Sequence, residues 1–274
     1  MRHRPLFIVK LGGSIITHKN REFPSIRKVN IVRIGKALVK NFDLKKYRLI
    51  LVHGAGSFGH LSAKKFDLAQ GTKDHPEKLF RALENQALDQ ELNTQMVKIL
   101  QTTALPVTGI KTSSVVTNKE GELSSFEMKA LLAALDTNTI PLLYGDMVFD
   151  TSWGMSICSG DVLTPFLAEK LKATKIFYAS DVDGIFTRDP FQYRDAKLIR
   201  EISLSGLLSG KISLSRSHNI DVTAGFKGKF EIYKKRVFPS LQAIHVFNGL
   251  KSENFNFISR KSTRVPGTII DAKK

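Results

Sequence analysis

The sequence is poor in cysteine and has no long apolar run. Cys158 is the only cysteine among 274 residues, so the chain cannot form an internal disulfide, which favours a reducing compartment. No apolar stretch approaches the roughly 20 residues of a membrane-spanning helix. The apolar run at residues 6–9 is interrupted by Lys10 too early for a signal peptide. We therefore expect a cytoplasmic protein with no membrane partner.

Several well-known catalytic signatures are also missing. The sequence has no Walker A motif, no protein-kinase catalytic loop, no zinc-binding spacing of cysteine and histidine, and no G-x-S-x-G motif. These absences argue against P-loop enzymes, protein kinases, zinc proteins and serine hydrolases of the common types. We expect no metal site made by protein side chains alone.

Negative charge is scarce. The chain has 42 Lys and Arg residues against 25 Asp and Glu residues, which gives a formal net charge of +17. Such an excess favours anionic partners, and nucleic acid is one interpretation. The basic residues are scattered, few aromatic residues lie among them, and no nucleic-acid motif is present. We therefore expect small phosphorylated ligands and no nucleic acid.

Short apolar runs alternate with longer helical patterns along the whole chain. Strands are predicted at residues 6–11, 48–53, 105–109, 140–144, 175–180 and 242–247, with a late edge strand at 267–270. Helices are predicted at residues 26–40, 76–100, 127–135, 161–171 and 223–235. This alternation indicates an α/β fold with a mostly parallel open sheet between helices. We expect one domain over residues 1–274.

Two glycine-rich segments follow predicted strands. In the first, K-L-G-G-S at residues 10–14, glycines let backbone amides approach a phosphate, and Lys10 and Lys19 can reach the same group. The second, residues 53–60, contains G-x-G-x-x-G, but Asp74, at the spacing of a dinucleotide-binding acid, precedes a helix rather than ending a strand. A phosphate loop, with His60 as a hydrogen-bond donor, fits better. An ordinary turn and a structural histidine are the alternatives.

Three later segments carry weaker signals. Asp161 in S-G-D opens a predicted helix, either as a simple capping acid or as a group that orients lysines. D-V-D-G at residues 181–184 ends a strand and can contact a nucleotide or a metal. Gly225 and Gly228 each cost roughly 1 kcal/mol of helix propensity, and Lys227 and Lys229 lie near a helix N-terminus, where cations are unfavourable unless an anion binds.

In this order, the five segments resemble the amino acid kinase superfamily, from about Phe7 to Ile270. Lys19 and the run G-S-F-G-H ending in His60 are similar to those of isopentenyl phosphate kinases. Fosfomycin kinases, which have a similar histidine, are the nearest alternative. A non-catalytic nucleotide-binding or nucleic-acid-binding protein is the third interpretation, which the retained Lys10, Lys19, Asp161 and Lys227 disfavour.

The resemblance implies ATP-dependent phosphorylation of isopentenyl phosphate to isopentenyl diphosphate, with Mg²⁺ bound to the nucleotide and often a homodimer. It implies an acceptor lobe at about residues 1–172 and an ATP lobe at about residues 173–274. The implied catalytic residues are Lys10, Lys19, His60, Asp161 and Lys227. The implied acceptor-binding residues are Ala55, Gly59, His60 and Gly160. The implied nucleotide-binding residues are Lys10, Leu11, Gly12, Gly13, Ser14, Gly56, Asp181, Phe186, Gly225 and Lys229.

The sequence departs from the family pattern at Ala55, where glycine is usual, and at Ala224 and Phe226, where glycine and methionine are common. These changes affect the expected fit of the acceptor more than the expected activity. An isopentenyl tail needs an apolar pocket. Leu79, Phe80 and Leu83 have the helical spacing to line one, although we favour a core position for them.

Overall fold

The N-terminal strand β1 (Leu6–Leu11) is buried at all six of its positions. All of its residues except Lys10 are apolar, as is typical of a strand covered on both faces. It pairs in parallel with β2 (Arg48–His53) on one side and with β9 (Lys175–Ser180) on the other. β1 is therefore the strand around which the sheet is built.

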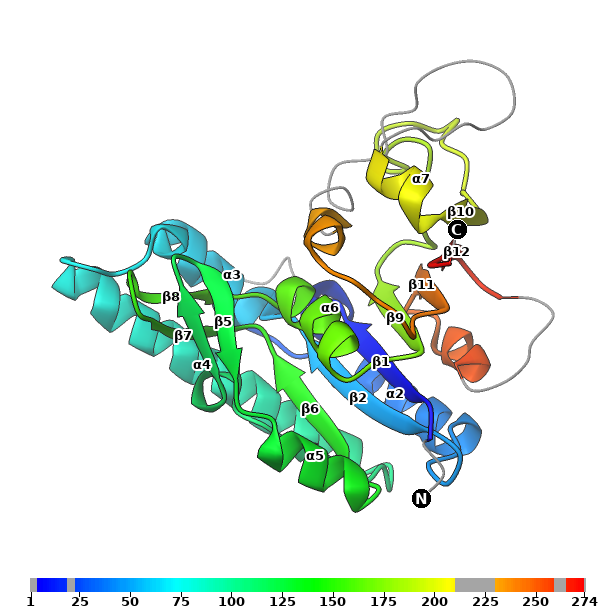
Figure 1. The fold of residues 1–274 in the computed structure, drawn as a ribbon, viewed down its shortest axis with the longest axis horizontal. Coiled ribbons are helices and arrows are strands. Elements are labelled where there is room, and N and C mark those ends of the chain that lie inside the picture. Colours follow the sequence, from blue (N-terminus) through cyan, green and yellow to red (C-terminus); the bar gives the residue numbers. More distant parts are fainter. Residues whose placement is uncertain (1–3, 19–22, 210–229, 259–264, 274) are drawn as a thin grey trace.

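The computed structural model describes residues 4–18, 23–209, 230–258 and 265–273. Its main sheet has eight strands in the order β10-β12-β11-β9-β1-β2-β6-β3 (Figure 1). The strands not yet introduced are β3 (Val107–Gly109), β6 (Ile140–Tyr144), β10 (Glu201–Ser203), β11 (Ala243–Asn248) and β12 (Thr268–Asp271). All neighbouring pairs are parallel except β11 and β12. The predicted mostly parallel α/β sheet is confirmed.

Helices cover both faces of this sheet (Figure 1). One face carries α2 (Lys28–Asn41) and α4 (Pro76–Gln101), and the other carries α5 (Lys129–Asp136) and α6 (Gly160–Lys170). Successive side chains of a strand point to opposite faces. Phe7 accordingly belongs to the core beneath α2 and α4, and Ile8 to the core beneath α5 and α6.

Shorter helices connect these elements. The α-helices are α1 (Gly13–Ile16), α3 (Gly56–Lys65) and α7 (Leu204–Ser209). The 3₁₀ helices are η1 (Leu68–Gln70), η2 (Thr112–Ser114), η3 (Ile232–Lys235) and η4 (Ser252–Phe257). α1 follows β1 and α3 follows β2 directly, so both helices start at the same edge of the sheet.

A second, four-stranded sheet has the order β5-β4-β7-β8. Its strands are β4 (Val116–Lys119), β5 (Glu122–Phe126), β7 (Asp146–Asp150) and β8 (Gly154–Cys158). Asp150 holds the hairpin ends together by accepting hydrogen bonds from the backbone amides of Gly121, Ser152 and Trp153. Partial burial opposes ionisation, but these bonds hold the pKa of Asp150 below its usual value. This sheet was not predicted.

The predicted strands at 6–11, 48–53, 140–144 and 175–180 have those bounds in the structure. The late strand was predicted at an edge, and that placement is wrong. β12 lies between β11 and β10, because residues 201–203 add a further strand outside it. The predicted helix at 223–235 lies outside the described residues up to 229, and residues 232–235 form a 3₁₀ helix.

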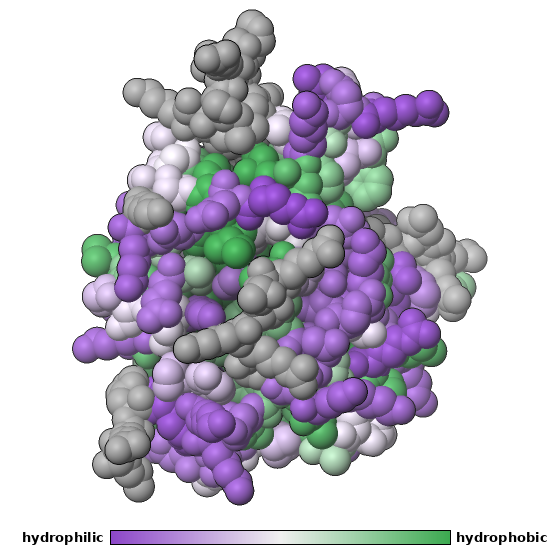
Figure 2. Space-filling view, turned by 90° about the vertical axis from the view of Figure 1, so that its right-hand side faces the viewer, coloured by the Kyte–Doolittle hydropathy of each residue, from purple (hydrophilic) through white to green (hydrophobic). Residues whose placement is uncertain are grey.

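The face that carries the C-terminal strands is mostly hydrophilic, with a band of hydrophobic side chains across its upper part (Figure 2). Among the described residues, no helix combines the length and the apolar character needed to cross a bilayer.

Two buried histidines make the stability of the fold dependent on pH. Burial lowers the pKa of His53 to about 4, and burial together with Lys175 lowers the pKa of His245 to about 3. The folded state therefore holds both rings neutral, whereas the unfolded chain binds protons below about pH 6.5. The stability that comes from burying both rings in the neutral form is fully present above pH 6.5. It is lost as the pH falls towards 3 to 4, because only the unfolded chain takes up these protons.

We predict that the free energy of unfolding falls by about 2 kcal/mol from pH 7 to pH 5 because of His245 alone, since the unfolded chain protonates this ring and the folded protein does not. His245 stacks on Phe177 at 4.9 Å between ring centroids, so His245→Phe keeps an aromatic ring in the core. Urea denaturation across this pH range should show a shallower loss of stability in the variant. Parallel curves for the variant and the unchanged protein would contradict the prediction.

Candidate functional site

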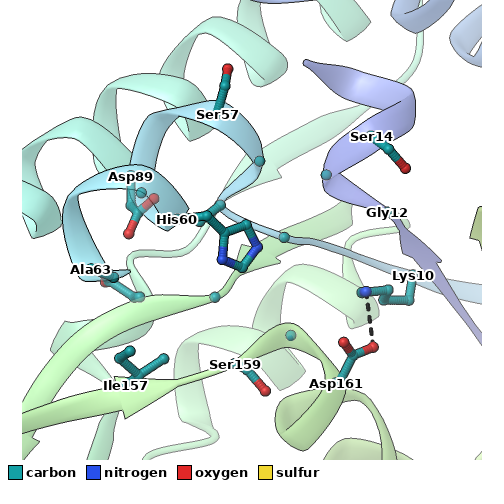
Figure 3. A pocket seen from close by; sticks show the side chains of 18 of the residues that line it. Lys10, Gly12, Ser14, Ser57, His60, Ala63, Asp89, Ile157, Ser159 and Asp161 are labelled. Atoms are coloured by element: carbon teal, nitrogen blue, oxygen red, sulfur yellow. Dashed lines mark ion pairs between the residues drawn. The ribbon is translucent and has the colours of Figure 1, made fainter. Parts of the chain in front are cut away.

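The loops that follow β1, β2, β6 and β9 meet at one edge of the main sheet. Because these strands are parallel, their carboxyl ends lie together, where open α/β sheets bind ligands. A cavity of about 510 Å³ opens at this edge (Figure 3). Its lining includes Lys10, Gly13, His60, Asp161 and Asp181, which come from four separate segments of the chain.

Lys10 and Asp161 form an ion pair in this cavity. The Nζ atom of Lys10 lies 2.9 Å from Oδ1 of Asp161 (Figure 3). Lys10 is 6% exposed on the central strand, and Asp161 lies in the first turn of α6. The hydroxyl of Ser159, not Asp161, caps this helix by accepting a hydrogen bond from the amide of Val162. The simple capping interpretation of Asp161 is therefore wrong.

The two glycine-rich loops press against each other. A Cβ atom on Gly13 would lie 2.6 Å from the Cα of Gly56, and Gly56 itself has a φ of +56°. Only glycine fits at either position without moving the backbone. The amide of Gly12 donates a hydrogen bond to the carbonyl of Ala179, so this amide is engaged inside the sheet. The expectation that it would face a phosphate does not hold.

His60 lies on α3, and its ring projects into the cavity (Figure 3). One residue earlier, Gly59 packs against α4. A Cβ atom there would lie 2.5 Å from Oδ1 of Asp89, and the side chain of Asn85 donates a hydrogen bond of 2.8 Å to the carbonyl of Gly59. Helix α4 therefore sets the position of α3 and, through it, the place of His60.

Most of the predicted site residues come together here. The predicted residues that line the cavity are Lys10, Gly12, Gly13, Ser14, Ala55, Gly56, Gly59, His60, Gly160, Asp161 and Asp181. Leu11 is buried within β1 instead, and Phe186 lies beyond the cavity, in an isolated bridge with Leu198. Lys19, Gly225, Lys227 and Lys229 lie outside the described residues.

Sequence reasoning missed the inner wall of the cavity. This wall includes Asn85 and Asp89 of α4, Asp146 of β7 and Ile157 of β8. Asp146 follows strand β6 almost directly, so its place after a strand was a usable signal. Asp89 shares the buried face of α4 with Leu92 and Met96, and a charged residue at such a position is unusual.

The acidic groups of this wall have raised pKa values. Burial raises the pKa of Asp146 to about 6, against hydrogen bonds from Ser113 that favour its charged form. Burial, then the neighbouring Asp146, raises the pKa of Asp89 well above its usual value. Burial also raises the pKa of Cys158 to about 12, so this thiol is a poor nucleophile.

The apolar residues considered for an acceptor tail lie elsewhere. Leu79, Phe80 and Leu83 are 40%, 60% and 43% exposed on α4. They do not line the cavity and are not core residues, so both interpretations of them are wrong. Ala63, Met147 and Ile157 supply the apolar part of the cavity wall.

A model of the amino acid kinase family matches residues 5–248. The chain belongs to the amino acid kinase family. Among its relatives, isopentenyl phosphate kinase from Methanocaldococcus jannaschii is 36% identical over 259 residues, covering 91% of this chain and 93% of that protein. Isopentenyl phosphate kinase from Thermoplasma acidophilum is 30% identical over 271 residues, covering 97% and 100%.

Solved structures agree with this family assignment. An isopentenyl phosphate kinase structure has a TM-score of 0.79 and 25% identity, and the alignment covers 97% of this chain and 100% of that one. UMP kinase from Bacillus anthracis, at 17% identity, shares the fold with a TM-score of 0.62 over 100% of this chain and 98% of that one. The resemblance to isopentenyl phosphate kinases predicted from the motifs is confirmed.

We predict that Gly13→Ala destabilises this family member, because the added methyl group meets the backbone of Gly56. Overpacking of this kind costs roughly 1–3 kcal/mol. Gly54→Ala is the matched control in the same pair of loops, since its Cβ would be 3.4 Å from the nearest atom. Thermal unfolding should show a clearly lower midpoint for Gly13→Ala only. Equal midpoints for the two variants would show that the loops adjust freely.

Proposed function

We propose that this protein is an ATP-dependent isopentenyl phosphate kinase, which forms ADP and isopentenyl diphosphate. The observation that carries the proposal is that one cavity brings together the Lys10–Asp161 pair, His60 and the two glycine-rich loops. The relatives named isopentenyl phosphate kinase, which match over almost their whole length, support the choice of acceptor.

Phosphoryl transfer requires positioning and charge neutralisation more than covalent chemistry. A phosphate monoester is mostly dianionic near pH 7, so it attacks without a general base. The difficulty is to bring two anions together. Lys10 supplies a positive charge, which Asp161 holds at the end of β1, and His60 supplies a donor on the acceptor side.

We assign the acceptor to the lobe of residues 1–172 and ATP to the lobe of residues 173–274. Supporting this division, His60 and Ala63 line the cavity from the first lobe, and Ser180 and Asp181 line it from the second. Mg²⁺ would accompany the nucleotide and neutralise its phosphates. Lys19 and Lys227 are predicted to join Lys10 around the transferred group. We further propose a cytoplasmic location.

The activity test measures ADP release from Mg-ATP and isopentenyl phosphate. We expect turnover by the unchanged protein and a loss of roughly 10- to 100-fold in His60→Ala, because a hydrogen bond to a charged group is removed. Lys10→Ala should lose roughly 100- to 1,000-fold, as for other groups that stabilise transition-state charge. His75→Ala is the matched control, since His75 is exposed and lies outside the cavity.

Each result has a clear meaning. Turnover with fosfomycin but not with isopentenyl phosphate would discard the acceptor and keep the mechanism. ATP binding without turnover of any acceptor would favour a non-catalytic nucleotide-binding protein. A similar loss in His75→Ala and His60→Ala would remove His60 from the site.

We also propose a homodimer that uses the exposed apolar residues Leu79, Phe80 and Leu83 of α4. Burial of such residues contributes to association, so the triple change to Ser should shift the protein towards the monomer. Light scattering at several concentrations measures this shift, and a change of Val29, which is exposed on α2, to Ser serves as the control. A monomeric unchanged protein would contradict the proposal.

A further inference from the structure

His53 is the last residue of β2, and its side chain has no exposed surface. The next two residues, Gly54 and Ala55, line the cavity, whereas His53 does not, so its ring lies behind the cavity wall. The ring stacks on Tyr144 of the neighbouring strand β6, with 5.4 Å between ring centroids and 13° between the ring planes. A polar ring at such a core position needs a partner for each of its nitrogen atoms.

Both ring nitrogens of His53 have a partner. Nδ1 lies 3.0 Å from the carbonyl oxygen of Gly54, and Nε2 lies 3.2 Å from the side-chain oxygen of Asn93 on α4. Burial lowers the pKa of His53 to about 4 against these two contacts, so near pH 7 the ring is neutral and carries one N–H proton. Only one of the two nitrogens therefore donates a hydrogen bond.

The two partners decide which nitrogen carries that proton. The carbonyl of Gly54 can only accept a hydrogen bond. The amide of Asn93 can turn about its side-chain bond and offer its NH₂ group to Nε2 in place of its oxygen. Both contacts are hydrogen bonds of a neutral ring only when Nδ1 carries the proton. The ring of His53 then donates to Gly54 and accepts from Asn93.

The bond from His53 fixes the peptide unit between Gly54 and Ala55. The described residues contain no cis peptide bond, and the C=O and N–H groups of a trans peptide unit point in opposite directions. Because the carbonyl of Gly54 points to the buried ring, the N–H of Ala55 points away from it, towards the cavity that Ala55 lines. Within the described part of the chain, no acceptor takes this N–H.

The backbone that follows has a conformation suited to an anion. Ala55 has right-handed dihedral angles, with φ −62° and ψ −25°, and Gly56 has a φ of +56°. A right-handed residue followed by a left-handed one turns successive N–H groups towards one concavity, which binds anions. The ring of His60 projects into the same cavity from α3 (Figure 3). The amide of Ala55 and the ring of His60 are thus donors to one cavity.

We propose that His53 is a positioning residue, whose Nδ1–H group holds the carbonyl of Gly54 and so aims the amide of Ala55 at the phosphate of the acceptor. The inference rests on the proposed function, which places the acceptor phosphate in this cavity beside His60. His53 itself contacts neither substrate. Asn93 and Tyr144 hold the ring in the tautomer and the plane that this bond requires.

The test uses two substitutions that each keep one half of the bonding of the ring. The amide nitrogen of asparagine is as many bonds from Cα as Nδ1, and that of glutamine is as many as Nε2. His53→Gln should raise the KM of isopentenyl phosphate roughly 10- to 100-fold, because a hydrogen bond to a charged group is lost, and leave the KM of ATP unchanged. His53→Asn should keep the KM of isopentenyl phosphate near that of the unchanged protein.

The controls separate positioning from folding. Both variants lose the ring that stacks on Tyr144, so a general loss of stability affects both of them. A KM does not depend on the folded fraction of a preparation. His245→Gln makes the same exchange at another buried histidine, on β11, which does not line the cavity, and should change neither KM.

A second measurement needs no variant. Nitrogen-15 NMR of the unchanged protein should show His53 as the neutral Nδ1–H tautomer from pH 8 down to about pH 5, because its pKa is about 4. The amide signal of Ala55 should shift when isopentenyl phosphate is added. An Nε2–H tautomer, or an Ala55 signal that does not respond to bound isopentenyl phosphate, would overturn the inference even if neither variant folds.

The kinetic results can also contradict it. Equal KM values of isopentenyl phosphate in His53→Gln and His53→Asn, or a rise in the KM of ATP that matches the rise for isopentenyl phosphate, would show a merely structural histidine. Either result leaves the proposed function in place. If the unchanged protein neither binds nor phosphorylates isopentenyl phosphate, the proposed function fails and this inference fails with it.

Discussion

The ion pair between Lys10 and Asp161 connects the central strand β1 with helix α6 at the edge of the sheet where the cavity opens. Lys10 is almost completely buried on β1, and Asp161 reaches it from the first turn of α6. Removing Asp161, whose side chain is 28% exposed, would leave the charge of the buried Lys10 without its partner. The pair therefore constrains where β1 ends and where α6 begins. The glycine-rich loops are arranged around that point.

Close contact between backbones is the second constraint on the site. Gly13 and Gly56 touch through their main chains, and Gly59 leaves room for the carboxyl group of Asp89. Each glycine removes a side chain where two elements must approach. Phosphate loops are usually explained by amides that face the ligand. In this protein, part of the glycine requirement comes from packing, as the engaged amide of Gly12 also shows.

The site separates charge over a short distance. One end offers a lysine and a histidine to a phosphate, and the other contains two carboxyl groups whose ionisation burial opposes. Low effective dielectric strengthens both effects. Burial thus gives the inner wall a chemistry distinct from that of the Lys10 end of the cavity.

Much of the fold could be predicted from the sequence. Strands buried on both faces are continuous apolar runs, so the bounds of β1, β2, β6 and β9 were predicted correctly. The second sheet was missed because its strands are short and partly polar, as in β5, where the sequence E-L-S-S-F has no buried position. The placement of β12 was wrong because strand order depends on long-range pairing rather than on local pattern.

The sequence by itself determined which segments follow strands and therefore which motifs gather at one edge, since parallel strands bring their carboxyl ends together. Lys10, His60 and Asp161 were found in this way. Only the tertiary structure decided that Asp89 faces the cavity. Asp89 and Asp146 are brought near each other when α4 packs beside β7, a contact that no local pattern encodes. The acidic inner wall is a product of helix packing, because burial and neighbouring charge exist only once distant segments meet.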